Sequence, residues 1–343
     1  MKYMGIDYHK QHFVATTVDE KGKVLSKERV STDRHSIRQY LSRANRGRDV
    51  KAVMEACYGW EYFYDEAEPL VEELIMAHPL KTRLIAEARI KTDSIDSESL
   101  AQLLRAGLIP EAYAPPFETR DKKALLRYRG ALTGFKVMLK NIVHSVLARN
   151  NIEDPAFRAL SDKFGKKGRS YLRGVTLRGN DTEILNNYLD LLEEVEAKMR
   201  LVEGRIRAVV RSDEICDLLK TLPGVGDIIS MLIRYEVDDV ERFVSSARLC
   251  SYAGLVPRTY SSGHRTYQGR ITKQGNKWLR WAMVEAAQRA IVNDEGVRAF
   301  YMRIAGKKGG KLARVAVARR LLQIAYWVWK EKRPYRAAAL FSV

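Results

Sequence analysis

Cysteine is scarce in this sequence, and long apolar runs are absent from it. The 343 residues include three cysteines, Cys57, Cys216 and Cys250, scattered without the spacing of metal ligands. A disulfide framework and a cysteine-based zinc site are therefore not supported. No segment reaches the roughly 18 uninterrupted apolar residues of a membrane span, and the N-terminus carries no signal-peptide pattern. We expect a cytoplasmic protein with no membrane partner.

Acidic residues become rare toward the C-terminus. From residue 258 to the end there are 19 Lys and Arg against 4 Asp and Glu, so most of the net charge of +18 lies in this last part. Such asymmetry predicts that the C-terminal part binds a polyanion. Nucleic acid fits better than a membrane surface, because no basic amphipathic helix with an apolar insertion face precedes it.

Four acidic residues are placed where their side chains can meet. Asp7 lies in one short apolar run and Glu55 closes another, and both runs predict strands. Asp93 and Asp96 are three residues apart at the start of a helical pattern, so they share one helix face. Grouped carboxylates repel one another unless a hard cation such as Mg²⁺ neutralises them. The four acids predict a two-metal phosphoryl-transfer site, although each acid alone is equally consistent with an ordinary surface residue.

The first part of the chain predicts an α/β fold with a mixed sheet. Its order of elements resembles that of the ribonuclease H-like fold. The expected strands are residues 2–19, 23–31, 50–56 and 74–77. The expected helices are residues 33–44, 61–73 with an interruption at Pro69, 81–90 and 94–106.

After Pro115 and Pro116 the pattern becomes helical. Apolar residues recur at helical intervals over 119–150 and again over 182–210, and charged residues separate them. This pattern is typical of a coiled-coil-like middle region. Exposed apolar seams seek partners, so we expect a homodimer or a homotetramer.

The last part of the chain carries two features typical of nucleic-acid binding. Residues 223–226, Pro-Gly-Val-Gly, predict a helix-hairpin-helix in which Gly224 and Gly226 let backbone N–H groups approach a phosphate. Residues 251–280 are rich in small, hydroxyl and basic residues, a composition suited to holding a phosphodiester. A simple chain-turning loop is the alternative interpretation of each feature. The basic candidates for nucleic-acid contact are Arg258, Arg265, Arg270, Lys273, Lys277 and Arg280.

Taken together and in this order, the motifs resemble those of the insertion sequence one-ten family of transposases. This family includes the pilin-gene invertases among its relatives, and the resemblance spans nearly the whole chain. The segments that carry it are residues 5–7, 54–56, 91–96, 222–226, 253–257, 262–263 and 272–276.

The resemblance implies a fold, a mechanism and partners. It implies a RuvC-like domain over residues 1–114 that binds Mg²⁺, with Mn²⁺ as the alternative, through Asp7, Glu55, Asp93 and Asp96. Residues 115–212 would form the coiled-coil region, and residues 213–343 a mainly α-helical domain that supplies a serine nucleophile. Ser262, directly before Gly263, matches best, although Ser261 adjoins it.

In enzymes of this kind the serine attacks a DNA phosphodiester and forms a transient phosphoserine link. The two domains complete the site together, across subunits. The family further implies a noncoding bridge RNA that pairs with donor and target DNA, and a prokaryotic cytoplasm as the setting.

Two other functions remain open from the residues. A metal-dependent nuclease or Holliday-junction resolvase would use water as the nucleophile, and its serines would only bind phosphate. A nucleic-acid-binding protein without activity would not need the acids at all.

Overall fold

The computed structural model describes residues 1–85, 93–152, 154–262 and 265–336. The chain forms two compact units, Met1–Ala114 and Pro115–Val343. No helix in the described part of the chain is long and apolar enough to cross a bilayer.

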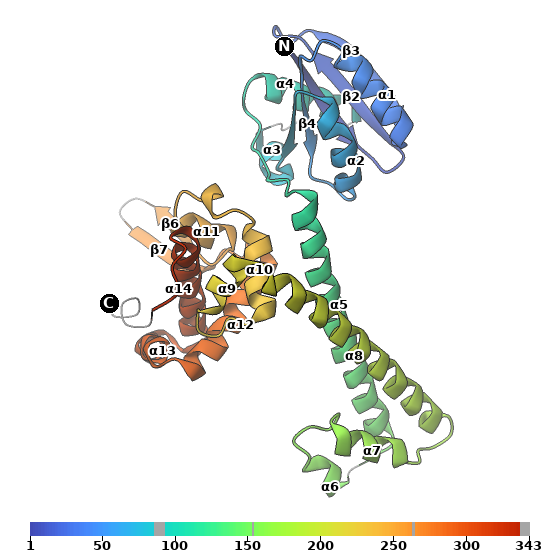
Figure 1. Cartoon of the computed structure of the whole chain (residues 1–343), viewed down its shortest axis with the longest axis vertical. Coiled ribbons are helices and arrows are strands. Elements are labelled where there is room, and N and C mark those ends of the chain that lie inside the picture. Colours follow the sequence, from blue (N-terminus) through green and yellow to red (C-terminus); the bar gives the residue numbers. More distant parts are fainter. Residues whose placement is uncertain (86–92, 153, 263–264, 337–343) are drawn as a thin grey trace. The chain divides into compact units, whose positions relative to one another are not determined.

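A mixed five-stranded sheet forms the centre of the first unit (Figure 1). The strand order is β3-β2-β1-β4-β5, in which β3, β2 and β1 pair antiparallel and β1, β4 and β5 pair parallel. The strands are β1 (Lys2–Tyr8), β2 (His12–Val18), β3 (Val24–Ser31), β4 (Val50–Glu55) and β5 (Glu73–Ala77).

The single strand expected over residues 2–19 is wrong, because the chain turns back between β1 and β2. The backbone N–H of His9 donates to the carbonyl of His12 at 2.9 Å and closes this turn. Lys10 and Gln11 lie within it. These consecutive polar residues interrupt the apolar run, and a turn satisfies their backbone groups at the surface.

The helix expected over residues 61–73 is interrupted near Pro69, as the sequence indicates, and does not resume after it. Helix α2 (Trp60–Ala67) ends in a 3₁₀ turn, η1 (Glu68–Leu70), which contains Pro69. Proline cannot donate the backbone hydrogen bond that a continuing helix requires. The chain is therefore free to enter β5 at Glu73.

Alternation along the strands divides the unit into two layers. Met4 and Ile6 of β1 and Met54 of β4 lie in one core with helices α1 (Arg34–Ala44) and α2. Val53 of β4 lies in a second core with Leu100 of helix α4 (Asp93–Arg105). Successive strand residues point to opposite faces, so the odd-numbered residues of β1 and β4 face α4.

Gly5 allows α4 to lie directly on β1. A Cβ atom at Gly5 would lie 2.0 Å from the Ser97 carbonyl oxygen and 2.5 Å from the Ala101 nitrogen. A second contact fixes the same helix, since the buried hydroxyls of Thr16 and Ser97 are 2.8 Å apart. The start of α4 is thereby held against the sheet.

The second unit begins with two long helices, α5 (Phe117–Arg149) and α8 (Asp181–Arg211). They run antiparallel: Arg129 pairs with Glu203 at 3.0 Å and Lys136 with Glu196 at 3.0 Å. Two short helices, α6 (Pro155–Arg158) and α7 (Lys166–Gly174), connect them and share an apolar core with them.

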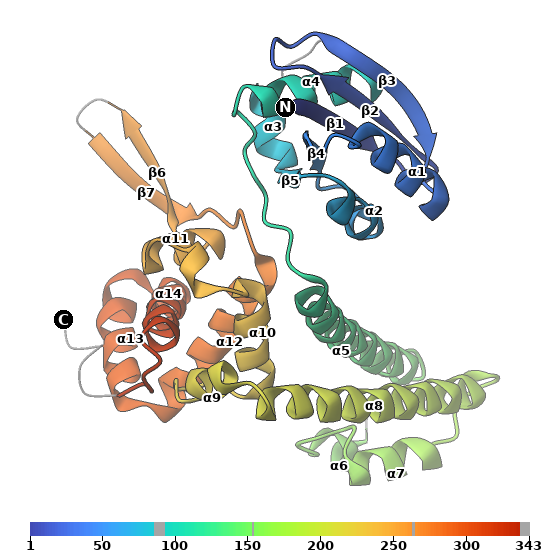
Figure 2. The ribbon, with the colours of Figure 1, turned by 45° about the horizontal axis from the view of Figure 1, so that its top comes forward.

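The rest of the second unit is a helical bundle around the apolar helix α14. An antiparallel pair of strands also belongs to it, and this pair was not predicted (Figure 2). Thr259, Tyr260, Thr266 and Tyr267 are residues with high strand propensity, but the glycines and serines beside them resemble a loop. The elements are α9 (Glu214–Lys220), α10 (Asp227–Val237), η2 (Val240–Arg242), α11 (Ser246–Tyr252), β6 (Pro257–Ser262), β7 (Arg265–Ile271), α12 (Lys277–Asn293), α13 (Glu295–Lys308) and α14 (Gly310–Lys330).

Replacing Gly5 by Ala should destabilise the first unit by about 1–3 kcal/mol or more, because α4 must move away from the sheet. Gly134→Ala is the control, since a Cβ there meets nothing within 4 Å in the middle of α5. In a helix interior this change should stabilise by up to about 1 kcal/mol. Calorimetric unfolding of the two variants measures the difference, and a Gly5→Ala protein as stable as the wild type would contradict the packing argument.

Candidate active site

An acidic pocket lies at the carboxyl ends of the parallel strands. Ile6 and Met54 are the last residues at which β1 and β4 pair with each other, so Asp7 and Glu55 follow side by side. Both face α4, whose first turn carries Asp96. These three acids line a pocket of about 80 Å³ together with Thr82 and Arg83 of helix α3 (Pro79–Ile85).

Asp93, the fourth predicted acid, lies beside two histidines of the β1–β2 turn. The Nε2 atom of His9 is 3.3 Å from an oxygen of Asp7 and 3.4 Å from an oxygen of Asp93. His12 Nε2 is also 3.4 Å from Asp93. The imidazole of His9 thus bridges the two aspartates and connects Asp93 to the three acids of the pocket.

Arg29 fixes the proton position on His12. A guanidinium nitrogen of Arg29 lies 3.2 Å from His12 Nδ1. Arginine only donates, so Nδ1 accepts and the imidazole proton is on Nε2, which donates to Asp93. His12 and Arg29 are not among the site residues predicted from the sequence. The sequence signal for His12 is its position three residues after His9, and Arg29 has no local signal.

The charges in this site are incompletely balanced. Burial raises the pKa of Asp7, the His9 contact opposes this rise, and the charges of Asp93 and Asp96 add to it. The hydrogen bond from His12 lowers the pKa of Asp93. The histidines offset only part of the repulsion between these carboxylates. A bound cation would relieve the remainder.

The donor set fits a hard divalent cation. Carboxylate oxygens of Asp7, Glu55 and Asp96 are ligands that Mg²⁺ prefers. The ligand atoms of His9, His12 and Asp93 also lie within 4.8 Å of one another, and imidazole is a ligand better suited to transition metals.

The predicted nucleophile lies on the strand pair of the second unit. Ser262 is the last residue of β6, and its backbone pairs with Arg265 at the start of β7. The side chains of Ser261, Ser262 and Arg265, and all of Gly263, lie outside the described residues. Arg258 and Arg270, two of the predicted phosphate contacts, are exposed on the same two strands.

Several motif residues anchor the base of this strand pair. Arg280 donates to the carbonyl of Ala253 at 2.9 Å. A Cβ atom on Gly254 would lie 2.4 Å from the Gln274 carbonyl, and one on Gly275 would lie 2.2 Å from the Tyr252 carbonyl. Lys273 lies in the same loop with a positive φ of 55°, and Lys277 begins α12.

A buried carboxylate joins this base to the long helix α5. Glu236 of α10 is 2% exposed. It accepts from Asn276 Nδ2 at 2.7 Å and from the Arg127 guanidinium, which lies 4.3 Å over the Trp278 ring. The Asn276 side chain also caps α12. Buried charges persist when paired in this way.

The two glycines of the predicted helix-hairpin-helix differ in their surroundings. A Cβ atom on Gly224 would lie 2.2 Å from the Ala286 carbonyl of α12, so this glycine permits close helix packing. Gly226 precedes α10 and a Cβ there would meet nothing within 4 Å. Their contact with a phosphate stays a prediction.

Two family models of transposases match this chain. The family model named for DEDD transposases of the IS110 type and described as "Transposase" matches residues 4–152. A second, described as "Transposase IS116/IS110/IS902 family", matches residues 216–302. The chain belongs to the IS110 family of transposases. It is therefore a DNA-acting enzyme, and the DEDD domain suggests a ribonuclease H-like fold and dependence on a divalent metal.

Relatives match along most of the chain. A transposase for insertion sequence element IS1111A from Coxiella burnetii is 26% identical, over 99% of this chain and 92% of the relative. A transposase for insertion sequence element IS1328 from Yersinia enterocolitica is 27% identical over 83% and 82%. A pilin gene-inverting protein of Moraxella bovis is 35% identical over 34% of this chain and 38% of its own.

Removing one acid should weaken binding of a divalent cation. We expect Asp96→Asn to lower the Mg²⁺ affinity at least about tenfold, since an uncharged amide replaces a carboxylate ligand. Glu98→Gln is the control, because Glu98 lies on the same helix but pairs with Lys27 at 2.9 Å on the surface.

Titration calorimetry and the stabilisation of the protein by added Mg²⁺ measure this affinity without requiring activity. Equal loss in both variants would show that the pocket does not hold the ion.

Proposed function

We propose that this enzyme is an insertion-sequence transposase that cleaves and rejoins DNA strands through Ser262. The observation that carries the proposal is the pairing of two features in one chain. One is an acidic pocket of Asp7, Glu55 and Asp96, joined to Asp93 through His9. The other is a serine at the end of a strand with basic residues along the same strand pair.

The reaction would exchange one phosphodiester for another. The serine Oγ forms a bond to phosphorus while the bond to one DNA oxygen breaks. The serine proton ends on the departing DNA hydroxyl, so no proton is gained or lost overall. Attack by a hydroxyl of another strand then reverses the exchange and frees the serine. The bond energy is kept throughout, and no ATP-binding loop is required.

The carboxylates have a defined task in this scheme. Asp7, Glu55, Asp93 and Asp96 would hold Mg²⁺, or Mn²⁺, which neutralises charge on the scissile phosphate and on the developing oxyanion. His9 and His12 orient Asp7 and Asp93 by direct contact. Arg258, Arg265, Arg270, Lys273 and Lys277 would bind the DNA backbone, while Arg280 positions the loop beneath the strands.

The partners we propose are donor DNA, target DNA and a structured guide RNA. From residue 258 to the end, 19 basic residues stand against 4 acidic ones, which supports polyanion binding. Guided enzymes leave sequence choice to base pairing. We further propose that the coiled-coil helices α5 and α8 assemble a homodimer or homotetramer in the prokaryotic cytoplasm.

Ser262→Ala should abolish a covalent protein–DNA adduct while DNA binding survives, because no other group would form the phosphoserine link. Ser261→Ala is the matched control and should keep the adduct. Denaturing gel electrophoresis on nicked, labelled DNA detects the linked protein. Hydrolysed ends without any adduct in the wild type would instead indicate a metal-dependent nuclease or junction resolvase that uses water.

A guided enzyme should copurify with a single defined RNA. We expect sequencing of RNA extracted from the purified full chain to return one dominant structured transcript. A mixture that mirrors total cellular RNA would contradict the guide role and leave an unguided recombinase.

A further inference from the structure

Helix α1 and the turn after it carry an unusual concentration of arginine. Residues 34–48 contain five arginines and one histidine, with no Asp or Glu. The whole first unit, residues 1–114, has 17 Lys and Arg against 18 Asp and Glu. The positive charge is therefore local, and the C-terminal excess of basic residues does not account for it.

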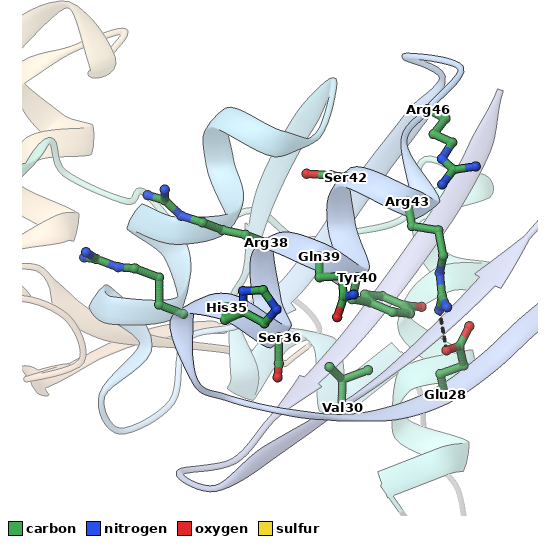
Figure 3. Close-up of a pocket in the computed structure, with 11 residues that line it drawn as sticks. Glu28, Val30, His35, Ser36, Arg38, Gln39, Tyr40, Ser42, Arg43 and Arg46 are labelled. Atoms are coloured by element: carbon green, nitrogen blue, oxygen red, sulfur yellow. Dashed lines mark hydrogen bonds and ion pairs between the residues drawn. The ribbon is translucent and has the colours of Figure 1, made fainter.

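Four of these arginines and His35 line an open groove along α1 and strand β3. Figure 3 shows Arg43 reaching toward Glu28 of β3, whereas Arg38 points away from Glu28. The groove has a volume of about 980 Å³. Arg34, Arg38, Arg43 and Arg46 line it, and Glu28 is the one acid among its lining residues. Ser36, Ser42 and Gln39 add neutral hydrogen-bonding groups along the same helix. We name this feature the arginine groove.

Ion pairs orient these arginines without neutralising them. Arg34 and Arg38 both contact Glu66 at 2.7 Å, so two positive charges share one carboxylate. The Glu66 side chain is 7% exposed, whereas those of Arg34 and Arg38 are 66% and 58% exposed. A guanidinium has five N–H donors, so most donors of both groups remain directed to solvent.

A third arginine is fixed against an aromatic ring. Arg43 pairs with Glu28 at 2.5 Å, and its guanidinium carbon lies 5.5 Å from the centre of the Tyr40 ring. Tyr40 is 5% exposed and belongs to the core between α1 and the sheet. Arginine pre-oriented in this way loses little further freedom when it binds an anion.

The arginine groove lies on the opposite face of the sheet from the acidic pocket. Ile37 and Leu41 of α1 pack with Met4 and Ile6, whereas the acids face α4. A strand held in the acidic pocket is therefore not the ligand of the groove. The groove requires a second polyanionic segment.

We propose that the arginine groove binds the sugar–phosphate backbone of a nucleic acid segment that is not being cleaved. Guanidinium groups contact phosphate oxygens in paired geometry, and hydroxyl and amide side chains add contacts to phosphate and sugar. This proposal rests on the proposed function and adds to it a second binding site, which holds nucleic acid away from the reacting strand.

The test replaces Arg34, Arg43 and Arg46 by Gln in the full chain that also carries Ser262→Ala. Arg38 is kept so that the buried Glu66 retains a partner. The control variant replaces Lys21, Lys23 and Lys51 by Gln, which removes the same charge from other surfaces of the same unit. Fluorescence anisotropy with an RNA hairpin and with a DNA duplex measures the affinity at several salt concentrations.

The arginine variant should flatten the slope of log affinity against log salt by about 2, since each lost phosphate contact accounts for about 0.7–0.9. A change with RNA only, or with DNA only, supports the proposal and names the source of the backbone. An unchanged slope with both probes, or an equal change in the lysine control, overturns it. No adduct forms in this background, so the outcome is independent of the serine chemistry.

Discussion

The close contact of helix α4 with strand β1 at Gly5 is the constraint on which the candidate site depends. Because glycine has no side chain, the helix backbone approaches the sheet directly. Asp7 follows Gly5 by two residues and therefore lies on the same face. The first turn of α4 then brings Asp96 to the ends of two parallel strands. A bulkier residue in β1 would separate the acids that the strands and the helix supply.

The carboxylates held together in this arrangement repel one another, and neighbouring histidines offset part of this repulsion. His9 lies between Asp7 and Asp93, and His12 donates to Asp93 because Arg29 fixes its tautomer. These contacts hold the side chains of Asp7 and Asp93 near each other. Such preorganisation is worth more at the moment of reaction than the same charges assembled from solvent.

The four acids could be chosen from the sequence because each lies in a local pattern. The apolar periodicity predicts two strands that end near an acid and a helix that carries two acids three residues apart. The same kind of periodicity predicts the long helices α5 and α8. The turn between β1 and β2 was missed, because its three polar residues interrupt a run that otherwise reads as one strand.

The strands β6 and β7 were missed for a different reason. The glycines and serines in these strands are typical of a loop sequence. Contacts between residues far apart in the sequence, such as Arg280 with Ala253, fix the base of the strand pair. The histidine contacts with Asp93 join residues about 80 positions apart, and no local pattern encodes them. The arginines of α1 can be read from the sequence, but only the fold shows that they line one groove.

Glu236 links three segments that are distant in sequence: Arg127 within α5, its own helix α10, and Asn276 at the start of α12. Asn276 follows β7 by a few residues, so Glu236 ties the long helix to the loop that leads out of the strand pair. Loss of the Glu236 carboxylate would therefore free Arg127 of α5 and Asn276 before α12 at the same time, and would leave the loop beneath the strand pair without its link to the long helix.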